Sequence, residues 1–257
     1  MSVAQSGLQI IPLTRISMVE ANDSLDSLLL DAIRQQDLEF VDEDILVIAQ
    51  KLVSKAENRL VRLDEIQASE HASKLAREVD KDERLVELIL RESTAVIRSA
   101  PGVIIVRHKL GLVCANAGID QSNIDHDDGP CALLLPEDPD ASAERLRSAL
   151  EATSGKRLGV VICDSVNRPW RLGSIAMSIG SAGIAPLDDR RGQADIFGRT
   201  LAVTMSNVVD SVATAASLVM GETTEKIPAV IVRGLSVSDG KRNSADCVRP
   251  ASEDLFL

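Results

Sequence analysis

Apolar residues follow two patterns along this chain: short compact runs, and longer segments with apolar positions three or four residues apart. The runs at residues 44–50 and 158–163 are almost wholly apolar, which is typical of strands buried on both faces. Residues 25–35 and 69–93 have helical spacing instead, and the second, highly charged segment is expected to break at Asp80 or Asp82. The pattern therefore predicts buried strands combined with amphipathic helices.

The same two patterns extend to residue 236, beyond which the sequence is polar and is expected to be loosely ordered. Further strands are predicted at residues 9–13, 95–97, 103–107, 112–115, 132–135, 175–179, 201–203 and, as the last, 228–233, with a hairpin turn at 108–111. A helix is predicted to start at Asp140 or Ser142 and to end at Gly155, and another to cover 208–220 with Gly221 as its C-cap. Because strands and helices do not alternate strictly, we expect an α+β fold with mixed or antiparallel sheets rather than a doubly wound parallel sheet.

Composition narrows the classes of partner. Only 2% of the 257 residues are aromatic, so stacking on nucleic-acid bases is not expected, and the net charge of -11 disfavours both a phosphate backbone and an anionic membrane surface. No apolar run reaches the ~18 residues of a membrane span, and no signal-peptide pattern is visible. We therefore expect a cytoplasmic protein whose four widely spaced cysteines are reduced structural thiols.

Familiar nucleotide, zinc and hydrolase motifs are absent from the sequence. It contains no GxxxxGK[ST] or GxGxxG loop, no HExxH helix and no GxSxG elbow. The three histidines, His71, His108 and His126, have no partner at ligand spacing and are expected at the surface. Any nucleotide would thus be bound without a standard phosphate loop.

Two aspartates that follow apolar segments stand out as candidate metal ligands. Asp120 ends a turn of small residues, and Asp164 directly follows the strand predicted at 158–163. Carboxylate oxygens at strand ends suit Mg²⁺ or Mn²⁺ bridging substrate phosphates, with the Ser165 hydroxyl as a further ligand and Asn123 as a donor to phosphate or base. Aspartate is also a favoured turn and cap residue, so residue type and spacing leave both interpretations open.

Positive charges gather near the same segments. Three of them directly follow the strand predicted at 44–50, namely Lys51, Lys55 and Arg59. They are either phosphate ligands or the solvated face of an exposed turn. Arg168 and Arg171 flank Trp170, either as bidentate phosphate ligands or as surface charge around a partly buried ring. Glu222, after the predicted helix at 208–220, is either a third metal ligand or an exposed loop residue.

Four segments together resemble one enzyme family. They are Gln50-Lys-Leu-Val-Ser-Lys-Ala-Glu57, Cys114-Ala-Asn-Ala-Gly-Ile-Asp-Gln-Ser-Asn123, Asp164-Ser-Val-Asn-Arg-Pro-Trp-Arg171 and Ile227-Pro-Ala-Val-Ile-Val-Arg-Gly234. In order and spacing they resemble the coenzyme F420-0:L-glutamate ligases, or gamma-glutamyl ligases, over nearly the whole chain from Ile11 to Gly234. The second and third segments are specific motifs, and the other two are weaker.

The resemblance implies a GTP-dependent ligase that joins the amino group of L-glutamate to the terminal carboxylate of F420-0 and then adds further glutamates through gamma-linkages. It implies two divalent ions, Mg²⁺ or Mn²⁺, together with K⁺. It also implies a homodimer whose α+β fold is neither P-loop nor ATP-grasp. We expect a single ligase domain over residues 1–257, without the C-terminal flavin-binding, reductase-like domain of some bacterial relatives.

The resemblance assigns roles residue by residue. Asp120 and Asp164 match ligands of one metal, Ser165 stands where a threonine normally helps to bind the second, and Glu222 is the expected ligand from the loop at 220–227. The expected guanine-nucleotide contacts are Pro12, Leu13, Thr14, Arg15, Gln50, Lys51, Lys55, Asn123, Gly221 and Glu222. Asp120, Asp164 and Lys55 are the expected catalytic residues.

Two segments depart from the family pattern. The loop at 222–226, Glu-Thr-Thr-Glu-Lys, is less rich in glycine than in archaeal members. Val166-Asn167 replaces the Thr/Asn-Gly or His-Gly that is common before Arg168, which could change substrate preference or the number of glutamates added.

Residues and resemblance together predict a mechanism. Metal ions would clamp the GTP triphosphate while the γ-phosphoryl group moves to the F420-0 carboxylate, and Lys55 with arginine help would bind phosphate oxygens. The glutamate amine would then attack the acyl phosphate. Three alternatives stay open on the sequence: an amide ligase with another acceptor or amino acid, a non-catalytic deazaflavin or nucleotide binder, and a metal phosphohydrolase.

Overall fold

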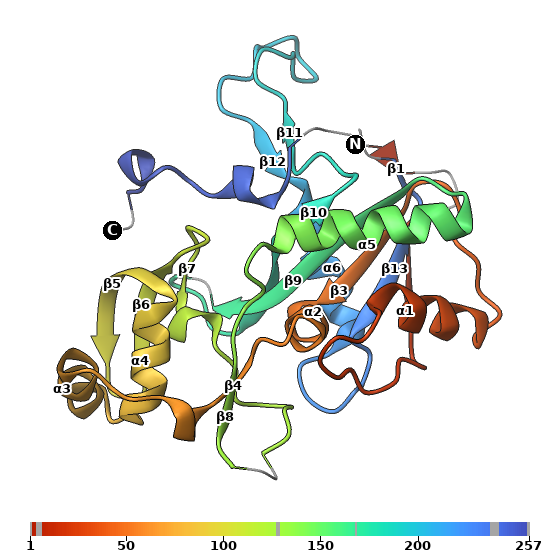
Figure 1. The fold of residues 1–257 in the computed structure, drawn as a ribbon. Helices are drawn as coiled ribbons and strands as arrows, with labels where there is room; N and C mark the ends of the chain where they lie inside the picture. Colours follow the sequence, from red (N-terminus) through yellow and green to blue (C-terminus); the bar gives the residue numbers. More distant parts are fainter. Residues whose placement is uncertain (1, 4–6, 127–128, 168, 237–241, 256–257) are drawn as a thin grey trace.

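One five-stranded sheet forms the centre of the structure, a computed structural model that describes residues 2–3, 7–126, 129–167, 169–236 and 242–255 (Figure 1). The strands are β1 (Ser2–Val3), β2 (Gln9–Pro12), β3 (Asp44–Ala49), β4 (Leu60–Arg62), β5 (Ser93–Ala100), β6 (Val103–His108), β7 (Val113–Ala115), β8 (Cys131–Leu133), β9 (Leu158–Asn167), β10 (Ser174–Ala182), β11 (Leu187–Asp189), β12 (Met205–Asn207), β13 (Ala229–Arg233) and β14 (Leu235–Ser236). The helices are α1 (Leu25–Arg34), α2 (Gln50–Ala56), α3 (Glu70–Val79), α4 (Glu83–Arg91), α5 (Pro139–Ser154) and α6 (Val208–Met220). In this described part of the chain, no helix combines the length and the apolar character that a membrane span needs.

The central sheet is mixed, as the lack of strict alternation predicted. Its strand order is β10-β9-β3-β13-β2, and every neighbouring pair is antiparallel except β3 and β9. The other described strands form small antiparallel sheets, of which β5-β6-β7 has three strands and the rest have two. The expected α+β class with mixed and antiparallel sheets is therefore confirmed.

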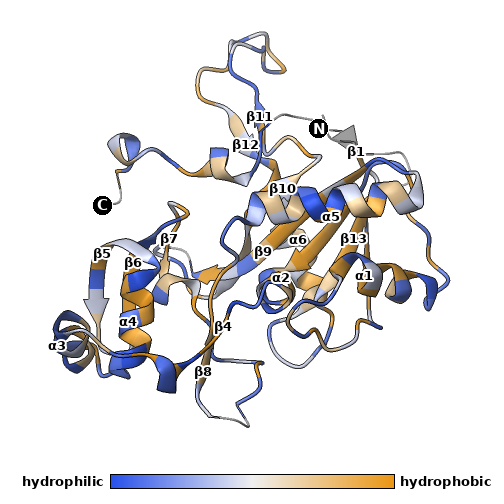
Figure 2. Ribbon diagram, in the orientation of Figure 1, coloured by the Kyte–Doolittle hydropathy of each residue, from blue (hydrophilic) through white to orange (hydrophobic). Residues whose placement is uncertain are grey.

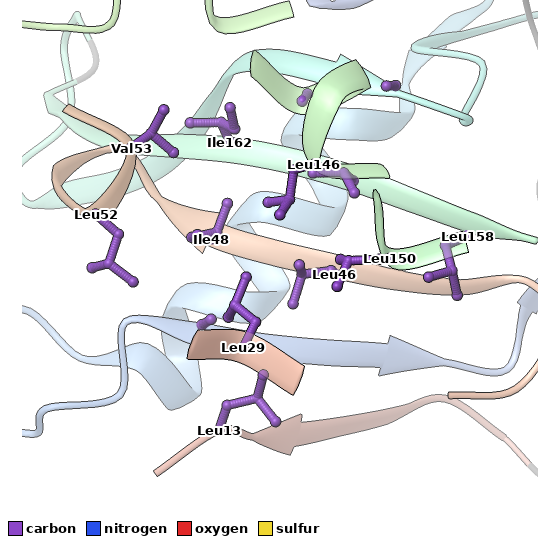
Figure 3. Close-up of a cluster of buried hydrophobic side chains, with 14 of the residues drawn as sticks. Leu13, Leu29, Leu46, Ile48, Leu52, Val53, Leu146, Leu150, Leu158 and Ile162 are labelled. Carbon is purple, nitrogen blue, oxygen red and sulfur yellow. The ribbon is translucent and has the colours of Figure 1, made fainter. Parts of the chain in front are cut away.

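Both faces of the central sheet are covered, which explains its continuously apolar strands. Leu46 and Ile48 of β3 pack on one face with α1 and α5, whereas Ile45 and Val47 pack on the other with α6. Figure 3 shows the first cluster, and Figure 2 shows the apolar strands between the helices. Because side chains alternate along a strand, a strand covered on both sides needs apolar residues at every position. Each such fully buried side chain stabilises the fold by roughly 1.5–3 kcal/mol.

A third hydrophobic cluster joins α3 and α4 to the sheet β5-β6-β7. Ile104 and Val106 of β6 pack there against Val86 and Ile89 of α4. The predicted break between the two helices is confirmed, since Asp80 adopts a left-handed conformation with φ 53°. This cluster lies beside the central sheet in Figure 1 and carries the turn that leads to Asp120.

The helix α5 starts earlier than predicted. Neither Asp140 nor Ser142 is its N-cap; that role belongs to Asp138, whose carboxylate accepts a hydrogen bond from a backbone N–H of the first turn at 2.9 Å. Pro139 occupies the first helical position, where its missing N–H costs nothing. The Asp140 carboxylate instead accepts a bond from the N–H of Ser181 at 2.7 Å.

Two predictions for the C-terminal half are also wrong. Residues 201–203 form no strand; β12 begins at Met205, because the Val203 side chain is 86% exposed and nothing packs it as a strand. β13 is not the last strand, since β14 follows it and pairs with β1. Beyond residue 236 the described tail holds two short 3-10 helices, Ser244–Cys247 and Ala251–Glu253.

His108 is buried, contrary to prediction, whereas His71 and His126 are exposed as expected. It is only 3% exposed because it continues the inward-facing set of β6 after Ile104 and Val106. Its Nδ1 accepts the N–H of Leu110 at 3.0 Å. Burial lowers the pKa of His108, and the nearby Glu92 carboxylate offsets this only in part.

This burial makes stability depend on pH. The unfolded chain binds the proton of His108 more readily than the fold does, so its contribution is fully present above pH ~6.5 and is lost as pH falls below that value toward the folded-state pKa. We expect the free energy of unfolding in urea to fall as pH decreases below 6.5, with a slope from this residue of at most about 1.4 kcal/mol per pH unit. His108→Asn keeps an acceptor for the Leu110 N–H and should remove this part of the slope. The exposed matched variant His71→Asn should keep it, and identical pH slopes in all three proteins would contradict the assignment.

Candidate active site

Strand register brings the predicted site residues to one edge of the central sheet. β3 and β9 run parallel with Ala49 beside Cys163, so Gln50 and Asp164 follow at the same level. β13 runs antiparallel to β3 and to β2, so the start of β13 and the end of β2 lie at this edge as well. Polar residues that are far apart in the sequence therefore become neighbours here.

The sequence predicted that the strand ends before Asp164, and this prediction is wrong. β9 continues to Asn167 and pairs with β10, where Met177 lies opposite Asp164. What ends at Cys163 is the pairing with β3, because the chain after β3 turns directly into α2. Asp164 is therefore held by β10 on one side and open toward α2 on the other.

The turn before Asp120 is fixed at both of its ends. Asn116, Ala117 and Gly118 all have left-handed backbone, with φ of 50°, 57° and 65°, and the Asn116 side chain accepts the N–H of Ile104 at 3.1 Å. Asp120 then exchanges two backbone hydrogen bonds with Leu133 of β8, at 2.8 and 3.0 Å. Its carboxylate is thus presented by rigid backbone, which suits a metal or phosphate site.

Lys51 connects α2 to this turn. Its Nζ lies 2.7 Å from Asp120 Oδ2 and donates to both the carbonyl and the hydroxyl oxygen of Ser122, at 3.0 and 3.1 Å. The Ser122 hydroxyl in turn donates to Asp120 Oδ1 at 2.8 Å. Burial alone would raise the pKa of Asp120, but these bonds from Lys51 and Ser122 outweigh it and hold that pKa below its usual value.

The pKa of Asp164 is shifted in the opposite direction to that of Asp120. Burial, with a further contribution from the negative charge of Asp120, raises the pKa of Asp164 to about 7, although Lys51 and the Gln50 amide act against the rise. Gln50 itself is almost completely buried, and its amide nitrogen favours the charged form of Asp164 without reaching full hydrogen-bond geometry with any described residue. A buried carboxylate whose charge is disfavoured by a neighbouring carboxylate is suited to bind a further cation.

Lys55, one turn after Lys51, lies over the same turn. Its Nζ donates to the carbonyl of Asn123 at 3.3 Å, and the Asn123 amide donates to the carbonyl of Thr223 at 3.4 Å. Desolvation and the neighbouring charge of Lys51 lower the pKa of Lys55. Asn123 thus ties the turn after Asp120 to the loop between α6 and β13.

That loop also reaches β9. Gly221 is the C-cap of α6, as predicted, and the Glu222 carboxylate after it accepts the Ser165 hydroxyl at 2.9 Å. Glu225 holds the loop in shape by accepting the N–H of Thr223 at 2.8 Å. Ser165 and Glu222, both predicted as metal ligands, are therefore brought together beside Asp164.

The segment predicted to bind the nucleotide at residues 12–15 lies at the same edge of the sheet. Leu13 is buried and bonds to the carbonyl of Ala229, at the start of β13. Thr14 is exposed and donates from its N–H to Gln36 at 2.7 Å, while the Pro12 carbonyl accepts from the same side chain at 3.0 Å. Arg15 is exposed.

Other predicted cations lie elsewhere. Arg59 is engaged by Glu92 and Glu137 at 2.8 and 2.9 Å, and it joins no phosphate-binding group. Trp170 is 84% exposed, not partly buried as its surroundings suggested, and Arg171 beside it is exposed. Arg168 lies outside the described residues.

Two site residues escaped the sequence analysis. Ser122 bonds to both Asp120 and Lys51, and the Asp-x-Ser spacing of a side-chain turn was a signal that could have revealed it. Cys114 lies near Asp164, which, after burial, helps to raise the pKa of both Cys114 and Cys163 to about 12. These two thiols stay protonated, so neither is an activated nucleophile. All four cysteines are free, as predicted.

The oxygen donors come in pairs. Across the described ranges, no three carboxylate, histidine or cysteine side chains converge in a geometry that could hold a metal ion. Asp120 acts electrostatically on Asp164, and the next residue along β9, Ser165, bonds to Glu222. Mg²⁺ is commonly held by one or two carboxylates together with water and substrate phosphates, so this donor set suits an ion that arrives with a phosphorylated ligand.

The turn before Asp120 is expected to be sensitive to a single methyl group. A Cβ on Gly118 would lie 2.8 Å from Leu135 Cδ1, in addition to adopting a φ of 65°. We expect Gly118→Ala to lower the free energy of unfolding by about 2 kcal/mol or more, measured in urea. Gly155→Ala is the matched control, because Gly155 has φ 67° with nothing near its Cβ position, and should lose only about 1 kcal/mol. Equal losses would show that Leu135 moves aside freely.

Comparison with known proteins agrees with the resemblance inferred from the motifs. The family model F420-0:Gamma-glutamyl ligase matches residues 14–234. The coenzyme F420:L-glutamate ligase of Methanothermobacter thermautotrophicus is 43% identical over 254 residues, covering 97% of this chain and 99% of the relative. Those of Methanopyrus kandleri and Archaeoglobus fulgidus are 41% and 38% identical, and each covers 97% of this chain and 97% or 96% of its own length. The chain therefore belongs to the F420-0:gamma-glutamyl ligase family.

Proposed function

We propose that this protein joins L-glutamate to the terminal carboxylate of coenzyme F420-0 and extends it with gamma-linked glutamates, using GTP and an acyl-phosphate intermediate. The observation that carries the proposal is the Lys51–Asp120 ion pair next to the buried Asp164, whose charge Asp120 disfavours, with Lys51 and Lys55 on one helix. Family membership and the names of the relatives support the choice of substrates.

The donor set fits hard divalent cations. Asp120, Asp164, Ser165 and Glu222 offer only oxygen atoms, and two of them repel each other without added positive charge. We propose that Asp120 and Asp164 hold a first Mg²⁺ or Mn²⁺ and that Ser165 and Glu222 help to hold a second, with K⁺ as a further cofactor. When bound, such ions would neutralise charge on the triphosphate and orient the transferred phosphoryl group.

Other residues of the chain would bind the nucleotide and align the reacting groups. Lys55 and the Asn123 amide would bind phosphate oxygens or base, and the buried Gln50 amide nitrogen would donate to an oxygen of the ligand. The exposed N-terminal segment Thr14 and Arg15 would contact the nucleotide at the same sheet edge. Rigid backbone at Asp120 and Asp164 would keep the reacting groups aligned.

The proposed chemistry balances in two steps. The γ-phosphorus of GTP forms a bond to the acceptor carboxylate oxygen while its bond to GDP breaks. The glutamate nitrogen then bonds to the acyl carbon, phosphate leaves with the C–O bonding pair, and the nitrogen releases its proton to solvent. Protein walls must exclude water until the amine attacks, since the acyl phosphate would otherwise hydrolyse.

The test is incubation with F420-0, Mg²⁺, L-glutamate and either GTP or ATP, with products weighed by mass spectrometry. We expect glutamate addition with GTP, and roughly a hundredfold loss of rate in Asp120→Asn and Asp164→Asn with melting curves unchanged. Asp64→Asn, an exposed aspartate paired with Arg62, is the matched control and should keep full activity. Full turnover in either site variant would overturn the metal assignment.

The same incubation separates the alternatives. Addition of a different amino acid, or of glutamate to a different carboxylate only, would favour the related amide ligase. Phosphate release without any acceptor would favour a phosphohydrolase, and nucleotide binding without turnover a non-catalytic binder. A cytoplasmic location remains part of the proposal, supported by four cysteines that form no disulfide.

We also propose that the protein is a homodimer. The hairpin β11-β12 pairs with no other described strand and projects from the body with its connecting loop (Figure 1). Ile196, Phe197 and Val203 on that loop are 92%, 89% and 86% exposed. An isolated two-stranded hairpin with exposed apolar side chains is marginal in water, and a second copy of the chain would cover it.

Light scattering tests this assembly. We expect a particle of twice the 27.6 kDa chain mass. Replacing Ile196 and Phe197 together by Ser should weaken association by roughly tenfold or more, since each loses apolar burial. Leu218→Ser, which changes an equally exposed residue on α6, is the matched control and should leave the dimer intact. A monomer at all concentrations would refute the dimer proposal.

A further inference from the structure

We propose that Lys51 competes with the divalent ion for Asp120, and that nucleotide phosphates relieve this competition by offering Lys51 a second partner. Metal and nucleotide would then bind cooperatively, with Lys51 as the link. The inference rests on the proposed function for the identity of the two ligands. It goes beyond that proposal by giving Lys51 the role of a positioning residue that couples the binding of metal and nucleotide.

The first support is the geometry around Lys51 Nζ. Three oxygen atoms surround it, Asp120 Oδ2 at 2.7 Å and the carbonyl and hydroxyl oxygens of Ser122 at 3.0 and 3.1 Å. An ammonium group has three donors, and here each of them has an oxygen. The cluster is thus a complete cation-binding set, and its strongest member is the carboxylate assigned to the metal.

The second support is electrostatic. Lys51 forms an ion pair with Asp120 and also favours the charged form of Asp164, so its positive charge acts on both carboxylates. A divalent ion on the same carboxylates would lie next to the ammonium group, and two cations a few ångströms apart repel each other strongly. The ion therefore gains the full attraction of both aspartates only when Lys51 moves away.

The third support is that the Lys51 side chain can move away from Asp120 toward a bound phosphate. It sits in the first turn of α2 on a flexible four-carbon side chain, and that side chain keeps 24% of its surface exposed. Lysine is a common point-charge ligand of phosphate. A triphosphate next to Asp120 would give Lys51 an anionic partner in exchange for the one it loses to the metal.

Lys55 provides the natural comparison. It projects from the same helix four residues later, but it donates to the carbonyl of Asn123 and makes no ion pair with Asp120. Replacing either lysine removes one local positive charge, but only the replacement of Lys51 frees the Asp120 carboxylate for the metal ion. The two positions thus separate competition for Asp120 from a general effect of charge.

The experiment measures Mn²⁺ affinity of the nucleotide-free full-length protein by electron paramagnetic resonance of free Mn²⁺. We expect Lys51→Met to tighten Mn²⁺ binding by roughly tenfold, because the ammonium group no longer competes. Lys51→Arg keeps the charge and should remain as weak as the parent. Lys55→Met should tighten binding far less, and Lys109→Met, a charge loss away from the site, should have no effect.

Cooperativity is the second readout. In the parent protein, Mn²⁺ should strengthen binding of a fluorescent GDP analogue, and the analogue should strengthen Mn²⁺ binding by the same factor. This factor should be several-fold smaller in Lys51→Met, whatever the change in nucleotide affinity itself. An unchanged factor would contradict the role of Lys51 as the link.

The outcomes separate this inference from the proposed function. Equal Mn²⁺ affinity in the parent and in Lys51→Met, with binding lost in Asp164→Asn, would overturn the competition and leave the metal site standing. Equal tightening in Lys51→Met and Lys55→Met would assign the effect to local charge and would also overturn it. Mn²⁺ binding that survives in Asp164→Asn would remove the metal site and the inference together.

Discussion

The candidate site depends on one constraint, the parallel register of β3 and β9. Both strands are apolar on both faces, so sliding one past the other by a single residue would turn its inner side chains to the wrong face. The register therefore holds Ala49 beside Cys163 and places Gln50 and Asp164 at one level. Ligands of open sheets that contain parallel strands bind beyond the carboxyl ends of those strands, and this edge is such a place.

The turn that carries Asp120 must also reach that edge of the central sheet, and β8 connects it there. Asp120 is bonded to Leu133 of β8, β8 pairs with β4, and β4 follows α2 after a short turn. Arg59 strengthens this path by donating to the carbonyl of Leu135 and binding Glu92 of the neighbouring cluster. The α3–α4 cluster is thus joined to the central sheet by backbone pairing and by one half-buried arginine, and Lys51 forms its ion pair with Asp120 where the two parts meet.

The parts of the fold that depend on residues close together in the sequence could be predicted from it. The apolar runs predicted β3 to within one residue and the start of β9, helical spacing predicted α1, and the C-cap glycine predicted the end of α6. Partners distant in the sequence could not be predicted in this way. Lys51 and Asp120 form an ion pair although β4, α3, α4 and the sheet β5-β6-β7 lie between them in the sequence. The burial of His108 depends on which face of β6 packs against α4. A single strand pattern also left open where Asp164 lies, because its partner β10 extends the strand beyond the apolar run.

The acidity of the chain bears on which form of nucleotide this site would take. With a net charge of -11, the protein repels a free triphosphate at long range. Among the described residues of the site, Lys51 is already bound by Asp120 and Ser122, and the pKa of Lys55 is lowered by desolvation and by Lys51. A triphosphate that brings its own divalent ions carries less negative charge and supplies cations for Asp120 and Asp164 at the same time. The charge pattern therefore favours binding of a metal–nucleotide complex over binding of either component first.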